Sequence, residues 1–173
     1  MFLIAALLYR LTTEVLMDNK DLSKFLGKLV SRSENQEAIN KVWAEAHEEL
    51  SADPNCTVSI KPLDVSIFGN DVAGKVGSCR LSIFRAGTAY NRERHPNSTQ
   101  FVFSLEGCGE IYVLEESGSW RVDRLGGVEN GALETCGHWT PAGIWHQPIP
   151  SKDHDWVVLA FHTATEVQDE FMV

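Results

Sequence analysis

The stretch GTAYNRERHPNSTQFVFSLEG, residues 87–107, decides the fold of this chain. Within it, Glu93 and His95 stand two residues apart, just before a run that reads as a strand. Residues two apart lie on the same face of an extended chain. We therefore expect these two side chains to point the same way from one strand edge.

The alternating run QFVFSLE, residues 100–106, has two chemically different faces. Gln100 begins the run and shares its face with Val102 and Ser104. The opposite face carries Phe101 and two further apolar residues. We expect this phenylalanine face to pack in the core between two sheets.

A second informative stretch, GHWTPAGIWHQPIP, lies at residues 137–150. Its PAG turn precedes a short strand that begins near His146, which we expect to be directed back across the mouth of a barrel. Two aromatic residues, Trp139 and Trp145, flank the turn. By its polar neighbours, His138 is expected to lie in a loop without a functional role.

Strand-like runs fill the chain from about residue 56 onward. They alternate with a period of two, and turn residues separate them at roughly 8–12-residue spacing. The runs are residues 57–61, 63–68, 79–85, 100–106, 110–115, 120–124 and 155–162. Many short strands at this spacing predict a closed barrel or a jelly-roll sandwich.

The N-terminal part, residues 2–50, has a helical period instead. Leu22, Phe25, Leu26 and Leu29 fall at i, i+3, i+4 and i+7 and form one apolar stripe. Such a stripe needs burial, so we expect a helical arm that covers the barrel or a partner. The apolar start of the chain is too short to span a bilayer, which takes about 20 residues.

Composition excludes some functions. The chain has 173 residues, enough for one domain, with 15 basic against 24 acidic residues and a net charge of −9. No basic cluster occurs, which argues against nucleic-acid binding. The four cysteines form no C-x-x-C pair, so we expect reduced thiols in a cytoplasmic protein, although one disulfide stays open.

Residues 87–107 resemble the first motif of the cupin superfamily, G-x5-H-x-H-x(3,4)-E-x6-G. Gly87 opens the motif and Gly107 closes it, with the expected spacing between them. The sequence departs from the motif at two positions. Glu93 stands in place of the first histidine and Gln100 in place of the acid, while His95 is retained.

The second cupin motif, G-x5-P-x-G-x2-H-x3-N, is matched by Pro141, Gly143 and His146. Its leading glycine is two places late, at Gly137, and Pro150 replaces the asparagine. The resemblance implies a mainly β chain with the double-stranded β-helix, a jelly-roll barrel, and an N-terminal helical arm. We place the arm at residues 1–50 and the barrel domain at 51–173.

The resemblance also implies a divalent metal held by Glu93, His95, Gln100 and His146. Two histidines and one carboxylate form the ligand set of open non-haem iron sites, so Fe(II) is favoured. Nitrogen and oxygen donors also suit Mn, Ni, Zn and Cu. The alternative is a cupin without metal that holds its ligand by hydrogen bonds.

Further residues are candidates for chemistry around this site. Tyr90 is a candidate hydrogen-bond donor to the substrate, and His162, at the end of a strand, is a candidate acid or base. Trp145, Trp139 and Arg92 are candidate walls and anchors of a substrate pocket. Rim packing or solvation of these side chains is the structural alternative.

The function predicted from these residues is a metal-dependent enzyme that acts on a small organic molecule inside the barrel, most readily a dioxygenase-type oxidoreductase. A non-catalytic sensor or carrier, and a cupin isomerase, lyase or cyclase, are the alternatives. Small cupins share this fold across several activities, so the fold does not select one. The resemblance also implies a homodimer.

Overall fold

The structure is a computed structural model that describes residues 17–72, 74–127 and 137–172. Two helices, α2 (Asn19–Val30) and α3 (Ser33–Ala52), precede the sheets, and two 3-10 turns, η1 (Val65–Phe68) and η2 (Asn70–Val72), follow the first strand. The strands are β1 (Val58–Leu63), β2 (Ser78–Phe84), β3 (Glu93–Arg94), β4 (Gln100–Glu106), β5 (Cys108–Leu114), β6 (Trp120–Gly126), β7 (Gly137–Thr140), β8 (His146–Pro150), β9 (Trp156–His162) and β10 (Glu170–Phe171).

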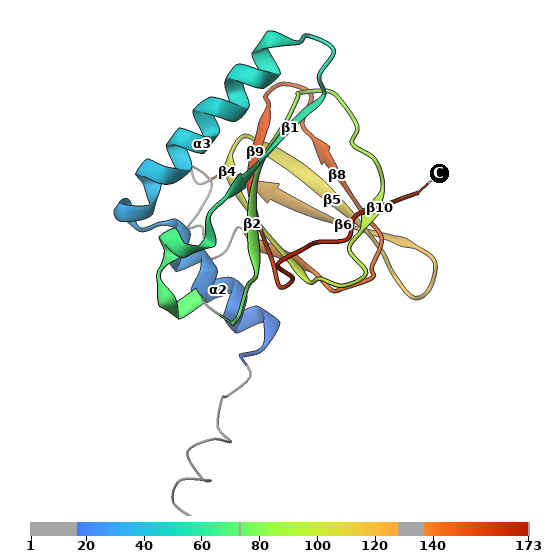
Figure 1. The fold of residues 1–173 in the computed structure, drawn as a ribbon. Helices are drawn as coiled ribbons and strands as arrows, with labels where there is room; N and C mark the ends of the chain where they lie inside the picture. Colours follow the sequence, from blue (N-terminus) through green and yellow to red (C-terminus); the bar gives the residue numbers. More distant parts are fainter. Residues whose placement is uncertain (1–16, 73, 128–136, 173) are drawn as a thin grey trace, which may run out of the picture.

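The strands form two five-stranded antiparallel sheets, ordered β1-β2-β9-β4-β7 and β10-β3-β8-β5-β6 (Figure 1). Strands that are far apart in sequence lie side by side, as β2 and β9 do over their whole length. This arrangement of antiparallel strands in two facing sheets is a jelly roll. The fold class predicted from the sequence is therefore confirmed.

Side-chain hydrogen bonds cap both ends of α2. The carboxylate of Asp18 accepts a hydrogen bond from Asp21 N at 2.8 Å and caps the start of α2. At the end of α2, the side chain of Asn35 donates to Leu29 O at 2.8 Å, which satisfies a carbonyl that the helix leaves unpaired. Among the described residues, no helix is both long and apolar enough to cross a membrane.

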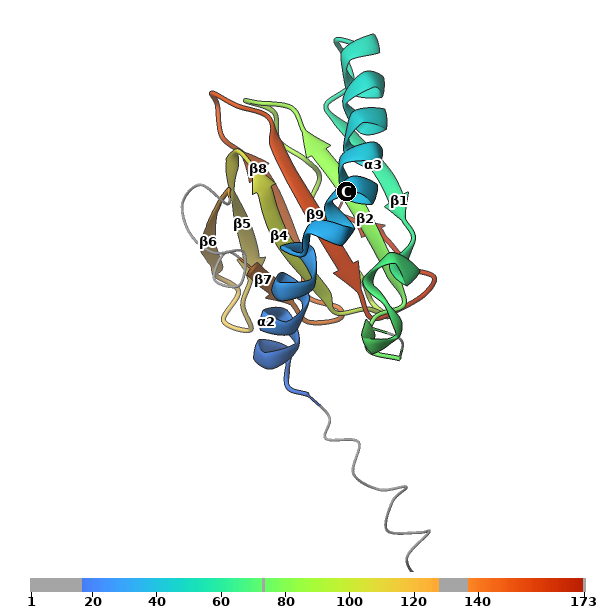
Figure 2. The same cartoon turned by 90° about the vertical axis from the view of Figure 1, so that its left-hand side faces the viewer.

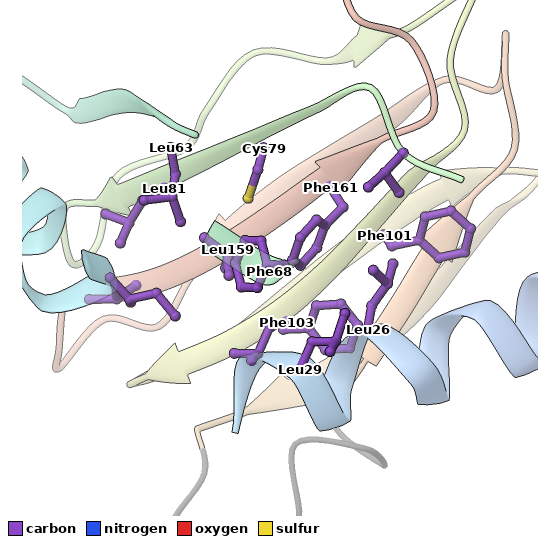
Figure 3. Packing of buried hydrophobic residues seen from close by; sticks show 14 of the residues in the cluster. Leu26, Leu29, Leu63, Phe68, Cys79, Leu81, Phe101, Phe103, Leu159 and Phe161 are labelled. Carbon is purple, nitrogen blue, oxygen red and sulfur yellow. The ribbon is translucent and has the colours of Figure 1, made fainter. Parts of the chain in front are cut away.

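The two helices cover the outer face of the β1-β2-β9-β4-β7 sheet (Figure 2). Leu26 and Leu29 of α2 are fully buried against Phe101 and Phe103 of β4 (Figure 3). The apolar stripe thus packs on the barrel itself, as one of the two expected outcomes. Burial of each such side chain stabilises the fold by roughly 1.5–3 kcal/mol.

The expectation that the phenylalanine face of β4 lies between the sheets is wrong. Phe101 and Phe103 belong to the cluster under the helices, whereas Val102 belongs to a second cluster with Ile111 and Trp156 inside the barrel. Alternation shows which residues share a face, but it does not show which face is interior. Here the helices bury the outer face as well.

Residues 63–68 were expected to form a strand. Instead, Leu63 ends β1, and η1 begins at Val65. The carboxylate of Asp64 accepts a hydrogen bond from Ser66 N at 2.8 Å, and Gly69 follows with a φ of +83°. A side-chain oxygen that bonds the backbone two residues on favours a turn over a strand. The alternating pattern of this segment was too short to outweigh that signal.

Candidate metal centre

Glu93 of β3 and His146 of β8 are direct partners in the antiparallel pairing of these two strands. His95 follows β3 and lies on the same side as Glu93, since both line one internal cavity. All three residues are buried. One potential ligand atom from each lies within 4.8 Å of the others, a separation that a single metal ion can bridge.

Three buried ring nitrogens at this place have no hydrogen-bond partner among the described residues: His95 Nδ1, His146 Nε2 and His162 Nδ1. Asp169 Oδ1 lies 2.9 Å from His95 Nδ1, but off the direction of a hydrogen bond. A buried polar atom without a partner costs about 1–3 kcal/mol. Unpaired nitrogens beside a buried carboxylate are what a metal site requires, so these residues fit a divalent cation.

Burial favours the neutral form of His95 and His162. Burial lowers the pKa of His95, against the opposing effect of Glu93. Burial, followed by the proximity of His95 and Arg80, lowers the pKa of His162 to about 2. The ring centroids of His95 and His162 are 4.9 Å apart. A neutral imidazole has a free lone pair, which is the form that binds a metal.

Gln100 and Tyr90 also lie at the cavity. The Nε2 atoms of Gln100 and His95 are 3.3 Å apart, so the carboxamide is next to the proposed ligands. The ring of Tyr90 packs edge-on against Phe84, with the centroids 5.4 Å apart. Burial, then the negative charge of Glu93, raises the pKa of Tyr90 to about 12, so its phenol stays protonated and able to donate.

The cavity itself is narrow, with a volume of about 60 Å³. This is room for a few water molecules or one small ligand. The polar residues described above form part of its wall, and the remainder is largely apolar, including Phe84, Val102, Ile111, Trp156 and Val158. A small organic molecule with an apolar portion suits such a wall.

Several solved structures share the fold of this chain. An oxalate oxidase in complex with glycolate matches at a TM-score of 0.54 and 15% identity, over 70% of this chain and 57% of that one. Oxalate decarboxylase from Lactobacillus farciminis matches at a TM-score of 0.53 and 14% identity, over 67% of this chain and 31% of that one. The fold is that of the cupins.

The same fold also occurs in Peruvianin-I, described as a cysteine peptidase from Thevetia peruviana latex, at a TM-score of 0.54 and 12% identity over 68% of each chain. By the coverages given above, this chain spans little more than half the length of the oxalate oxidase and about a third of that of the decarboxylase. No protein-family model matches the sequence. Among curated proteins, none is similar to it in sequence.

Three residues predicted to form the substrate pocket, Trp139, Trp145 and Arg92, are not among the residues that line this cavity. Trp139 is opposite Phe101 on the outer face of the sheet and is 37% exposed. Trp145 precedes the inward-facing His146, so it points to the other side, where Arg94 lies 4.7 Å from its ring centre. Arg92 is exposed, and its guanidinium lies 5.0 Å from the ring centre of the half-buried Trp120.

His138 was expected in a loop, but it lies on strand β7 and is buried. Its Nδ1 is 3.0 Å from Asp123 Oδ2 on β6, and its Nε2 is 2.9 Å from Thr140 Oγ1. Burial, against the opposing charge of Asp123, lowers the pKa of His138 to about 4. This contact joins the two sheets of the cupin barrel.

Sequence reasoning missed two charged residues of the cavity, Arg80 and Asp169. Arg80 lies on β2, where it alternates with Cys79 and Leu81, which are buried under the helices. The sequence signal for Arg80 was a charged residue within a strand whose two faces are both buried. Asp169 precedes β10 near the end of the chain, and nothing in its local sequence indicated that it would return to the cavity.

Proposed function

We propose that this chain is a metal-dependent cupin enzyme that acts on a small organic molecule inside the barrel, as a non-haem iron oxidoreductase of the dioxygenase type. The observation that carries the proposal is the convergence of Glu93, His95 and His146 in a buried place with unpaired ring nitrogens. Oxalate oxidase, one of the structures with this fold, is an oxidoreductase by its name.

The donor set favours Fe(II) among the divalent metals. Two imidazoles and one carboxylate leave positions free for a small molecule, which is the arrangement of non-haem iron oxygenases. When bound, the metal would supply Lewis acidity or redox chemistry. Gln100, beside His95, offers its carboxamide oxygen as a fourth, neutral donor, and Mn, Ni, Zn and Cu are alternatives with the same donors.

The chain's own residues would orient the substrate and move protons. Tyr90 carries a protonated phenol at the cavity and donates a hydrogen bond to a substrate oxygen. His162 is neutral, and within the described residues its Nδ1 has no hydrogen-bond partner, so it is a candidate hydrogen-bond partner for the substrate near His95. The apolar wall, with Trp156 fully buried, limits the water around the reacting atoms.

The alternative from another class is a binding module without turnover. Gln100 in place of an acid favours it, because a neutral carboxamide is a weaker ligand than a carboxylate. A cupin isomerase, lyase or cyclase would use the same metal without dioxygen. Fe(II) reconstituted under nitrogen separates these readings: the proposal expects nitric oxide to bind the iron and substrate-dependent oxygen uptake to follow.

A chain that retains no Fe(II), Mn or Zn after reconstitution and desalting contradicts the metalloenzyme. Metal retention with nitric oxide binding but no oxygen uptake, across a panel of small acids, aldehydes and alcohols, favours the isomerase or lyase alternative. Metal-free protein that still binds small molecules is a sensor or carrier.

Assembly and compartment are further parts of this proposal. We propose a homodimer, for which the edge strand β1, with Ile60 39% exposed, offers unpaired backbone groups to a second copy. We also propose a cytoplasmic location, supported by the free thiols of Cys56, Cys79 and Cys108. Light scattering at several concentrations tests the first, and localisation of the tagged full chain tests the second.

A further inference from the structure

The cavity contains a cation that the proposed metal ligands do not use, Arg80 on β2. Arg80 faces the cavity with Ser82 and Phe84, because β2 alternates between the two faces of its sheet. Within residues 17–72, 74–127 and 137–172, no other arginine or lysine lines this cavity. The Arg80 side chain is 27% exposed, so its guanidinium is partly buried, and an anionic partner stabilises such a charge.

The partner in this structure is Asp169, but it uses only one nitrogen of Arg80. Arg80 Nη1 lies 3.3 Å from Asp169 Oδ1 and 3.0 Å from Oδ2. Over the described part of the chain, Nε and Nη2 of Arg80 make no hydrogen bond. These two nitrogens form one edge of the planar guanidinium, and such an edge binds a carboxylate through two parallel hydrogen bonds.

Arg80 is linked to the proposed metal centre through Asp169. Both carboxylate oxygens of Asp169 contact Arg80 Nη1, and Oδ1 also lies 2.9 Å from His95 Nδ1. Only the width of a carboxylate thus separates the arginine from a proposed metal ligand. A molecule of a few heavy atoms is long enough to contact both, which agrees with a cavity of about 60 Å³.

The charge of the cavity favours an anion once a metal is present. Glu93 and Asp169 supply two negative charges and Arg80 one positive charge, so the protein alone is negative there. A divalent cation reverses this to a single positive charge. One carboxylate would then neutralise the cavity, whereas a neutral ligand would leave a buried net charge, which is unfavourable.

We propose that Arg80 anchors the carboxylate of the substrate, so that the cavity takes a small monocarboxylic acid with its other end at the metal and on the apolar wall. The inference rests on the proposed function, because it takes the metal centre as the place where the substrate reacts. Asp169 holds Arg80 in position from the C-terminal segment and is a positioning residue.

The test uses calorimetric titration of the full chain loaded with Mn(II), which is stable in air. The probes are acetate, propionate and butyrate, each paired with its neutral amide of the same shape. We expect each acid to bind about ten- to a hundredfold more tightly than its amide, the effect of hydrogen bonds to a charged group. Arg80→Gln should abolish this preference and retain bound Mn(II).

Two further variants make the result specific. Arg92→Gln removes an arginine outside the cavity and should keep the full preference for acids. Arg80→Lys keeps the charge but lacks the planar fork, so we expect part of the preference to remain. If circular dichroism shows that Arg80→Gln is unfolded, Arg80→Lys takes its place in the test.

The outcomes separate the two proposals. Equal affinity of wild-type protein for acid and amide overturns the role of Arg80, as does an unchanged preference in Arg80→Gln or Arg80→Lys. Failure of the Mn(II)-loaded protein to bind any of the acids overturns it too. Protein that takes up no metal, yet prefers acids through Arg80, overturns the metalloenzyme and keeps the carboxylate site.

Discussion

Glu93 and His146 lie opposite each other in the pairing of β3 with β8, with Glu93 Oε1 3.6 Å from His146 Nε2. This distance exceeds that of a hydrogen bond, so a carboxylate oxygen and an unpaired imidazole nitrogen face each other across a gap. Both sit on a short strand pair that is anchored by the longer β5. The backbone therefore holds two donors of different charge in fixed register.

The first prediction is that Glu93→Gln lowers divalent metal affinity while the shape of the site is kept. Loss of an outer hydrogen-bond partner of a ligand typically lowers affinity 10–100-fold, so loss of an anionic ligand should lower it at least as much. His95→Ala should be more severe, because it also leaves a gap. Metal content after desalting, measured for equal protein concentrations at one pH, gives the result.

The matched control is Glu110→Gln, which changes a glutamate on β5 that pairs with the exposed Arg124. Its metal content should equal that of the wild type. If Glu93→Gln and His95→Ala both retain wild-type metal, then these residues are not ligands. The cavity is then a binding site without metal.

The next prediction concerns acid sensitivity. Burial lowers the pKa of His138 to about 4, whereas an unfolded histidine titrates near 6.5. Between these values the unfolded chain binds the proton and the folded chain does not. The free energy of unfolding therefore falls as the pH drops from about 6.5 to about 4, by roughly 1.4 kcal/mol per pH unit for each such histidine.

Urea unfolding of metal-free protein at pH 7.5, 6 and 5 measures this slope. His138→Gln should make the slope shallower by about one proton, and it should also lower stability at pH 7.5, since the contact with Asp123 is lost. His47→Gln on the exposed face of α3 should leave the slope as it is. An unchanged slope in His138→Gln contradicts the assignment of this group.

Some of the site could be predicted from the sequence, and the reason is local spacing. Glu93 and His95 lie within one strand edge, and His146 follows a recognisable turn, so two short motifs identify all three. Arg80 and Asp169 could not be found in this way. They meet only because β2 lies in the other sheet and the C-terminal segment returns to pair with β3.

The local sequence pattern also could not predict which strand face lies inside the barrel. Phe101 and Val102 alternate, and both are buried. The choice between them as interior residue depends on where α2 packs, and that is a long-range contact. Trp139 was expected at the cavity for a similar reason. Its sequence position does not show which face of the sheet the side chain occupies.

A further prediction concerns the helical arm. Leu26→Ala removes a fully buried side chain between α2 and β4, so we expect the free energy of unfolding to fall by about 2–5 kcal/mol. Lys24→Ala on the same helix changes an exposed side chain and should have an effect within about 0.5 kcal/mol. Urea unfolding of both variants compares them. Similar stability of the two would mean that α2 does not pack on the barrel in solution.

The last prediction concerns why a glycine is needed at the end of the first motif. Gly107, between β4 and β5, has a φ of +70°, and a Cβ atom there would collide with the backbone carbonyl of Asp155. Gly87, which opens the motif, has a similar φ of +69°, but a Cβ atom there would make only an ordinary contact, 3.9 Å from Lys152 O. The two positions therefore separate backbone conformation from close packing within one motif.

Gly87→Ala should cost about 1–2 kcal/mol of stability, the penalty for a side chain in the left-handed region. Gly107→Ala should cost about 3 kcal/mol or more, because overpacking against a backbone group adds about 1–3 kcal/mol. The backbone cannot move aside cheaply, since the side chain of Asp155 also accepts a hydrogen bond from Ala86 N at 2.8 Å. Urea unfolding midpoints at pH 7.5 measure both variants. Equal midpoints would mean that the turn alone requires glycine and that the approach of Asp155 does not.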